Sequence, residues 1–240
     1  MISKHQGIVL HQLRYNDKSL ICRVFTAEFG LKTFLIRIGT NPKKSVLPLL
    51  QPMNVVEFDS KLKESGAMNT LKDLRLAVHY TDVPFNPVKS AIALFMDEVL
   101  YKTIHDDYQN VDLYQLIVKA MLLLDQEEDV RNFPIWFLLE LSKEYGFYPQ
   151  RNGEEDAIFD LKEGVFYPKN VPCPQALGIE ASAALLDMVE EDYETVRNVR
   201  HPAAVRLALL EGLMQYLQIH LENLRNIRSL SILHEVFHSA

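Results

Sequence analysis

The sequence has few of the residues that build metal sites, disulfide frameworks and phosphate-binding loops. Its two cysteines, Cys22 and Cys173, cannot supply a four-thiolate zinc site or a disulfide framework. Its nine glycines are scattered, and none forms the G-x-x-x-x-G-K-[ST] or G-x-G-x-x-G pattern that binds nucleotide phosphates. The G-x-S-x-G turn of serine hydrolases is also missing. We therefore predict no metal, no cofactor, no catalytic residues and no enzyme activity.

Long hydrophobic runs are missing as well. No apolar stretch reaches the roughly 18 residues that a membrane span needs. The first residues, MISKHQG, lack the basic-then-apolar pattern of an export signal. The hydrophobic fraction of 48% and the charged fraction of 24% are ordinary for a folded chain. These features predict a cytoplasmic protein without a membrane partner, and 240 residues accommodate one or two domains.

Positive charge is scarce overall and unevenly distributed. The net charge of −7, taken alone, argues against binding to a polyanion. Residues 1–83 nevertheless carry 12 Lys and Arg against 7 Asp and Glu, a net +5, whereas residues 84–240 carry 13 against 25, a net −12. This asymmetry suggests two units with different partners, although scattered surface charge would give the same count. A basic unit can concentrate a polyanion even when the whole chain is acidic.

Residues 1–83 have the pattern of short strands separated by turns. In the last run, Leu74 and Leu76 alternate with Asp73 and Arg75, the period of two of a half-buried strand. Five strands in so few residues favour a small closed barrel, because closure removes exposed edges. A longer link before the fourth run fits an OB-type barrel, and an SH3-like barrel stays open. The runs are residues 7–10, 20–25, 31–38, 54–58 and 71–78.

From residue 84 onward the hydrophobic period becomes helical. Asn86 is suited to cap a helix whose first residue is Pro87. Downstream, apolar residues recur at steps of three and four. We predict an all-helical domain over residues 84–240, with a proline-rich insertion at about residues 146–174 that contains a hairpin. The predicted helices cover residues 88–100, 113–124, 135–141, 181–189, 203–221 and 229–237, and the hairpin strands cover 158–161 and 165–167.

One string near the end matches a catalytic pattern. His234-Glu235-Val236-Phe237-His238 fits H-E-x-x-H, in which two imidazoles one helical turn apart bind zinc and the glutamate acts as base. Only Ser239 and Ala240 follow, so we expect no downstream third ligand. The end of a terminal helix is also a poor place for a preorganised metal. A zinc hydrolase is therefore an alternative, against an amphipathic last helix whose histidines face solvent.

The basic half of the chain offers a candidate nucleic-acid interface. Loop lysines and strand arginines around an open barrel face can follow a phosphate backbone, and nearby aromatic rings such as Tyr15 can stack on bases. Ordinary surface charge is the alternative interpretation of the same residues. The candidate nucleic-acid-binding residues are Arg14, Lys18, Lys32, Arg37, Lys43 and Lys44.

The order of several short motifs resembles the bacterial DNA repair protein RecO family over nearly the whole chain. The N-terminal half resembles the first hairpin, the second turn, the basic loop and the L-Q-P signature of that family. The C-terminal half resembles the helix that precedes the family's insertion and the closing helices. The motifs are Gln6–Leu10 with Arg14–Leu20, Thr26–Leu31, Arg37–Gly39 with Pro42–Ser45 and Leu50–Pro52, Phe137–Leu141 with Tyr145–Pro149, and His220–Leu221 with Ser229–Leu230 and Leu233.

This resemblance implies an N-terminal OB-type barrel, residues 1–83, and a helical C-terminal domain, residues 84–240. It implies binding to single- and double-stranded DNA at the nucleoid and annealing of complementary strands. It further implies cooperation with RecR in loading RecA onto strands coated by the single-strand DNA-binding protein. The acidic, phenylalanine-containing tail of that protein needs an apolar pocket beside a cation, for which Arg197, Arg200 and Arg206 are candidates.

The sequence departs from the family in the insertion. Many members carry four cysteines there as a zinc site, whereas this sequence has only Cys173, so we predict no zinc. The basic excess of residues 1–83 is also modest, so DNA affinity is expected to be weaker than in strongly basic members. A protein-interaction adaptor that does not bind DNA itself is the main alternative to a DNA-binding mediator.

Overall fold

The computed structural model describes residues 2–39, 45–62, 68–105, 109–153 and 157–239. By internal contacts, the chain divides into two compact units, Met1–Asp125 and Gln126–Ala240. In its described residues, the first unit therefore contains two α-helices and a short 3-10 helix, Leu47–Leu50, in addition to the strands, and the boundary after residue 83 stays a prediction. The first unit carries 15 Lys and Arg against 13 Asp and Glu, a net +2, and the second carries 10 against 19, a net −9.

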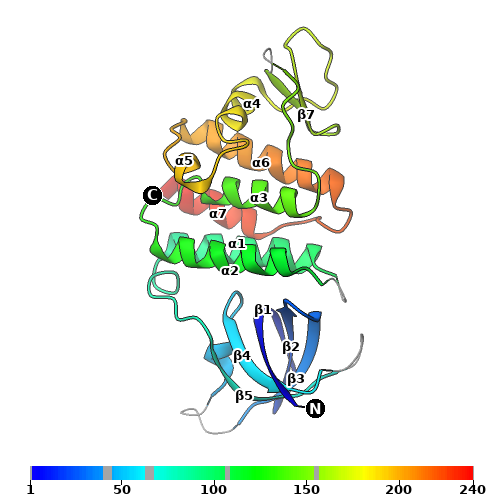
Figure 1. Ribbon diagram of the computed structural model, residues 1–240. Coiled ribbons are helices and arrows are strands. Elements are labelled where there is room, and N and C mark those ends of the chain that lie inside the picture. The colour runs from blue at the N-terminus through cyan, green and yellow to red at the C-terminus, as the bar shows by residue number, and fades with distance from the viewer. Residues whose placement is uncertain (1, 40–44, 63–67, 106–108, 154–156, 240) are drawn as a thin grey trace. The chain divides into compact units, whose positions relative to one another are not determined.

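The first unit is built on a five-stranded antiparallel sheet, drawn in blue and cyan in Figure 1. The strand order is β3-β2-β1-β4-β5, which is the order of an OB-type barrel cut open between β3 and β5. The five predicted strands are confirmed, and the first is longer than predicted. Their bounds are β1 Ser3–Asn16, β2 Ser19–Thr26, β3 Gly30–Arg37, β4 Val55–Ser60 and β5 Leu71–Leu76.

The two edges of this sheet approach each other at Asn69, just before β5. The amide of Leu35 donates to the carbonyl of Asn69 over 2.9 Å, and the amide of Asn69 donates to the carbonyl of Thr33 over 2.9 Å. Phe34 and Asn69 form an isolated bridge outside the named strands. Within the described residues, the barrel is therefore joined at one bridge rather than closed by a continuous ladder.

The barrel core forms because alternate side chains of the strands point to one face. Phe34 and Phe58 meet edge to face inside it, with ring centroids 5.0 Å apart. In β1, three consecutive apolar side chains are buried, those of Ile8, Val9 and Leu10. Val9 lies in the barrel core, and helix α1 packs against β1. Burial on both faces explains why this strand does not show the alternation that a half-exposed strand would.

Two helices complete the first unit. Helix α1, Pro87–Thr103, begins as predicted: the side-chain oxygen of Asn86 accepts hydrogen bonds from the amides of Val88 and Lys89, and Pro87 is the first helical residue. Helix α2 follows over Val111–Gln126.

The connector between the strands and α1 is held by the carboxylate of Asp125 at the end of α2. This carboxylate accepts hydrogen bonds from the amides of Thr81 (2.8 Å), Asp82 (2.9 Å) and Val83 (2.9 Å). Buried Lys89 completes the arrangement, because its ammonium lies 2.6 Å from an Asp82 oxygen and donates to the Asp125 carbonyl. We call these residues the Asp125 clamp.

The second unit is helical and contains the predicted hairpin. Strands β6 and β7 pair within the insertion, so the hairpin prediction is confirmed, whereas the one-turn helix α5 was not predicted. Helix α6 packs against both α3 and α4. None of the helices in the described part of the chain is long and apolar enough to cross a membrane. The bounds are α3 Phe133–Glu144, β6 Ile158–Asp160, β7 Val165–Tyr167, α4 Ile179–Leu186, α5 Tyr193–Val196, α6 Ala203–His220 and α7 Ser229–Ser239.

Candidate nucleic-acid interface

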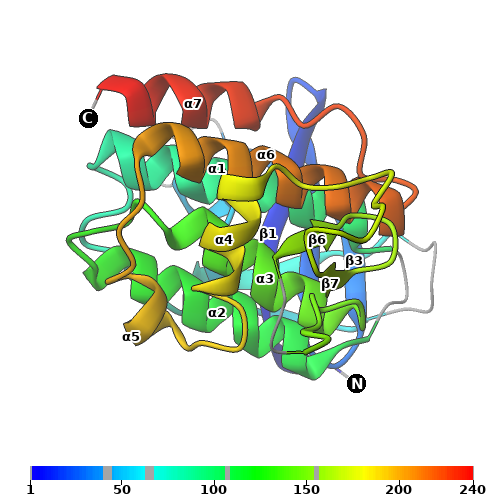
Figure 2. The same cartoon turned by 90° about the horizontal axis from the view of Figure 1, so that it is seen from above.

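The hairpin that joins β1 and β2 defines one end of the sheet. Its turn is Asp17-Lys18, and the side-chain oxygen of Asn16 accepts a hydrogen bond from the amide of Lys18 over 2.9 Å. The carbonyl of Lys18 accepts from the amide of Ile38 over 2.8 Å, which fixes the end of β3 against the turn. Figure 2 shows this blue hairpin at the end of the sheet away from the N-terminus. Three strand segments therefore meet at one rim.

The rim gathers three of the predicted cations. Arg14 lies near the end of β1, Lys18 in the turn and Arg37 at the end of β3, and all three are exposed. Arg37 pairs with Ser19 across the β2–β3 ladder, directly after the turn. Among the residues that the structure describes, no acidic side chain forms an ion pair with any of the three. We call Arg14, Lys18 and Arg37 the rim cations.

Lys32 lies apart from this rim. It pairs with Val24 near the opposite end of β3 and is only 8% exposed. The structure therefore does not bring Lys32 to the rim cations, although it is on the same strand as Arg37. Lys43 and Lys44 lie outside the described residues.

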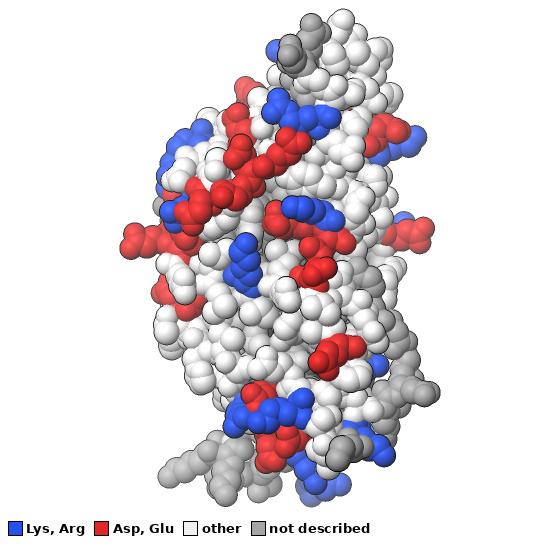
Figure 3. All heavy atoms as spheres, viewed as in Figure 1, with Lys and Arg blue, Asp and Glu red and all other residues white. Residues whose placement is uncertain are grey.

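Charge elsewhere is mixed in sign. On the face of Figure 3, blue and red side chains are interspersed, and this face has no uniformly positive field. An interaction with a polyanion would therefore depend on local clusters such as the rim cations rather than on the charge of the whole chain.

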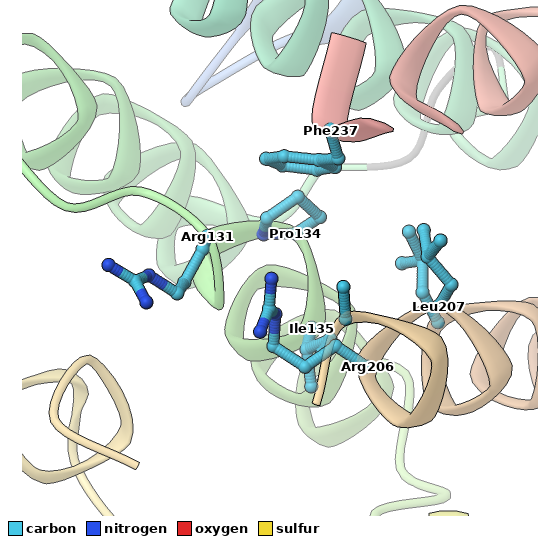
Figure 4. A pocket seen from close by; sticks show the side chains of 8 residues that line it. Arg131, Pro134, Ile135, Arg206, Leu207 and Phe237 are labelled. Carbon is cyan, nitrogen blue, oxygen red and sulfur yellow. The ribbon is translucent and has the colours of Figure 1, made fainter. Parts of the chain in front are cut away.

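A second candidate site is a shallow apolar pocket in the second unit, between α3, α6 and α7. Arg131 and Arg206 lie next to each other on one side of it, and the ring of Phe237 lies beside Pro134 (Figure 4). Burial and the nearby Arg131 lower the pKa of Arg206, and the carboxylate of Asp129 opposes part of this effect. The other lining residues are Ile135, Ala203, Leu207 and Leu210.

Of the three predicted partner-binding arginines, only Arg206 lines this pocket. The guanidinium of Arg197 binds both carboxylate oxygens of Glu127, at 3.0 and 3.1 Å, so the carboxylate neutralises it and raises its pKa. Arg200 is exposed and donates to the carbonyl of Arg197. Arg131 was not predicted. The available sign of a functional role was that Arg131 directly precedes Asn132, the N-cap of the strongly apolar helix α3. The approach of α6 and α7, which completes the pocket, was not visible in the sequence.

The H-E-x-x-H string falls on α7. The Nε2 atom of His234 lies 3.6 Å from a carboxylate oxygen of Glu211 on α6. The side chain of His238 lies outside the described part of the structure. Among the described residues, no group of three or more His, Cys, Asp and Glu side chains is placed to hold a metal.

The two cysteines are in unreactive surroundings. Cys22 is fully buried in the barrel core, and burial raises the pKa of its thiol to about 12. Cys173 donates a hydrogen bond to a carboxylate oxygen of Asp160 over 3.0 Å, and burial with this hydrogen bond raises its pKa to about 11. The amides of Lys162 and Glu163 donate to the other oxygen of Asp160. Asp160 thus ties the hairpin turn to the segment around Cys173.

A five-stranded sheet in OB order with cations at one rim, followed by a helical unit, defines the class of OB-fold proteins with an appended helical domain. The family model of the recombination protein O N-terminal domain matches residues 1–80, and that of its C-terminal domain matches residues 84–230. The chain belongs to the RecO family.

Curated relatives support the same assignment. A protein named DNA repair protein RecO from Flavobacterium psychrophilum is 30% identical over 237 residues, which cover 98% of each chain. A protein of the same name from Bacteroides fragilis is 30% identical over 241 residues, which cover 99% of this chain and all of the relative.

Proposed function

We propose that the protein is a non-catalytic, DNA-binding mediator of recombinational DNA repair. In this proposal it binds single- and double-stranded DNA, anneals complementary strands and, together with RecR, helps to load RecA onto strands coated by the single-strand DNA-binding protein. It would act in the cytoplasm at the nucleoid. The observation that supports the DNA-binding part is the gathering of the rim cations in a member of the RecO family.

The rim cations suit annealing because the step requires no covalent chemistry. Two strands repel each other through their phosphates, and bound cationic side chains reduce that repulsion because they neutralise phosphates; the release of condensed counterions favours this binding. Arg14 and Arg37 each present a planar guanidinium group, whose donors match the geometry of phosphate oxygens. Lys43 and Lys44 follow β3 by only a few residues in the sequence, so we include them in the proposed interface.

An annealing assay with complementary fluorescent oligonucleotides at low salt tests the proposal. Replacing Arg14, Lys18 and Arg37 by Ala should slow annealing by at least about tenfold, because the lost phosphate contacts are electrostatic and additive in this regime. The matched control replaces Lys4, Lys61 and Lys72, three exposed lysines at the opposite end of the same sheet. Both variants lose three positive charges, and the control also breaks the ion pair of Lys4 with Glu57, at 3.2 Å.

Equal annealing by the wild type and both variants would remove the rim from the proposal. Failure of the wild type to retard any oligonucleotide would instead favour the adaptor alternative, in which the protein binds only other proteins. Retained binding to RecR would then be the positive sign of an adaptor.

We further propose that the pocket beside Arg131 and Arg206 binds the acidic tail of the single-strand DNA-binding protein. Phe237, Pro134 and Leu207 offer an apolar surface for a phenylalanine side chain, and the two arginines offer charge for carboxylates. Arg131 is already hydrogen-bonded to Asp129 over 2.7 Å, so Arg206 is the more available cation.

Fluorescence polarisation with a labelled acidic peptide that ends in phenylalanine tests this part. Arg206→Ala should weaken peptide binding by at least about tenfold, since a charge-assisted contact contributes about 1.5–3 kcal/mol. Arg151→Ala, at an exposed position in the same unit, is the control and should bind as the wild type does. Equal affinity of all three proteins would place the tail elsewhere.

A further inference from the structure

The tip of the β1–β2 hairpin exposes large apolar side chains beside the rim cations. Leu13 is 58% exposed and Tyr15 is 62% exposed, whereas Phe25 and Phe34 of the same sheet are fully buried. Exposed apolar side chains that gather at one place commonly mark an interaction site. Tyr15 is therefore an aromatic ring of this sheet that the barrel core does not use.

Tyr15 also occupies a special position in the ladder. Arg14 pairs with Leu20 and Asn16 pairs with Ser19, so the register shifts at Tyr15, which has no residue opposite it on β2. Such bulges redirect a side chain away from the regular pattern of the strand. The hydrogen bonds of the turn fix the residues that directly follow this ring.

An apolar row leads from this ring across three strands. Leu13, Ile21 and Leu35 are directly opposite one another on β1, β2 and β3. The next row toward the tip contains Ser19 and Arg37. The apolar row and the row with Arg37 are thus two residues apart along the strands, about 7 Å.

This combination favours one kind of occupant. Single-stranded DNA presents flat apolar base faces and a polyanionic backbone at the same time, whereas a duplex hides its base faces in the stack. The rim cations supply the charge complementarity that a purely apolar partner would not need.

We propose that Tyr15 stacks on an unpaired base, so that the hairpin tip selects single-stranded over double-stranded DNA. This inference rests on the proposed function, because it assumes that the rim cations contact the phosphates. It adds Tyr15, as a residue that determines specificity, to an interface that the rim cations define by charge.

Binding to three probes of equal length tests the proposal: an oligo-dT strand, a strand of abasic sites and a duplex. Tyr15→Ala should weaken oligo-dT binding by about tenfold, within the range measured for loss of one base–aromatic stack, and should leave the other two probes unchanged. Tyr15→Phe should bind oligo-dT as the wild type does. Phe85→Ala, which removes an 81% exposed ring elsewhere in the same unit, is the matched control and should change nothing.

A spectroscopic measurement separates stacking from an indirect effect on the fold. The chain has one tryptophan, Trp136, which is buried at 3% exposure. Tyr15→Trp introduces an exposed second tryptophan, whose emission should be quenched by oligo-dT and not by the abasic strand.

Two results would overturn the inference while leaving DNA binding itself intact. One is that Tyr15→Ala weakens binding to all three probes equally, which would assign the ring a structural role. The other is no loss for any probe, which would assign the apolar row to a protein partner. If the wild type binds none of the probes, the proposed function fails, and the inference fails with it.

Discussion

Gly164 lies where the side chain of Tyr216 leaves no room for a Cβ atom. Its φ angle is +71°, in the left-handed region, and a Cβ atom there would lie 2.5 Å from the hydroxyl oxygen of Tyr216. Tyr216 cannot move away easily, because it is 1% exposed, donates to the carbonyl of Phe147 and packs edge to face on Phe159. Position 164 thus requires glycine both because of its φ angle and because Tyr216 leaves no space for a Cβ atom.

Gly164→Ala should lower the free energy of unfolding by about 2 kcal/mol or more, the combined effect of a left-handed alanine and a steric overlap. Urea denaturation measures this loss. Gly146→Ala is the matched control: its φ angle is +81°, but a Cβ there would meet no described atom within 4 Å. The control should lose about 1 kcal/mol from the backbone angle alone.

A double-mutant cycle identifies the steric part. Tyr216→Phe removes the hydroxyl that the new methyl group would meet, so Gly164→Ala should be less destabilising in the Tyr216→Phe background than in the wild type. Gly164→Ala could instead lower the free energy of unfolding equally in the two backgrounds, or by the same amount as Gly146→Ala. Either result would show that small shifts relieve the steric overlap with Tyr216.

At the scale of elements, the Asp125 clamp joins the connector to the end of α2. Burial alone would raise the pKa of Asp125, but the hydrogen bonds from Thr81, Val83 and Asp82 lower it from its ordinary value of 3.8 to about 2. The folded state therefore favours the ionised carboxylate. The stabilisation is fully present above about pH 4 and is lost as the pH falls through the native pKa.

Asp125→Asn should lower the free energy of unfolding at pH 7 by about 2 kcal/mol, because it replaces charge-assisted hydrogen bonds and points amide hydrogens at backbone donors. Urea unfolding measured from pH 7 to pH 2.5 should show the difference between wild type and variant shrinking below pH 4. Glu28→Gln, an exposed acid of the same unit, is the control. A difference that stays constant with pH would contradict a role of the ionised form.

The elements themselves were largely predictable from the sequence. The Asn86-Pro87 cap and the helical periodicity defined α1, and strong β propensity between turns defined the five strands. Helix α5 was not predicted, because four residues are too few to show a helical period. The extra length of β1 was missed for a different reason: its middle is buried on both faces and its ends are exposed, so neither part alternates.

The candidate sites were less predictable than the elements. Lys32 alternates with the apolar residues Phe34 and Ile36 and so shares their buried face, whereas Arg37 ends the strand at the rim. The register of three strands brings Arg37 to the other rim cations, and register depends on the whole sheet. In the same way, Arg131 and Arg206 come together only because α3 and α6 pack, which is a contact between distant parts of the sequence.

At the scale of the whole molecule, an overall charge of −7 must be reconciled with DNA binding. The two compact units differ in net charge, +2 against −9, and the rim cations are a local cluster in the more positive unit. Exposed charges more than about 10 Å apart are largely screened near 0.1 M salt, so the local cluster governs binding there. At lower salt the acidic unit acts over a longer range and opposes association.

This balance predicts how the affinity for single-stranded DNA depends on salt. Each neutralised phosphate of a single strand contributes about 0.7 to the slope of log K against log salt, so replacing Arg14, Lys18 and Arg37 by Ala should reduce that slope by about 2. Titrations of an oligo-dT strand between 50 and 300 mM salt, a range of about sixfold, measure it. The matched variant that lacks Lys4, Lys61 and Lys72 has the same net charge and should keep the wild-type slope. If the slope of log K against log salt decreased equally in both variants, binding would depend on the total charge of the chain. The rim would then have no special role in contacting phosphates.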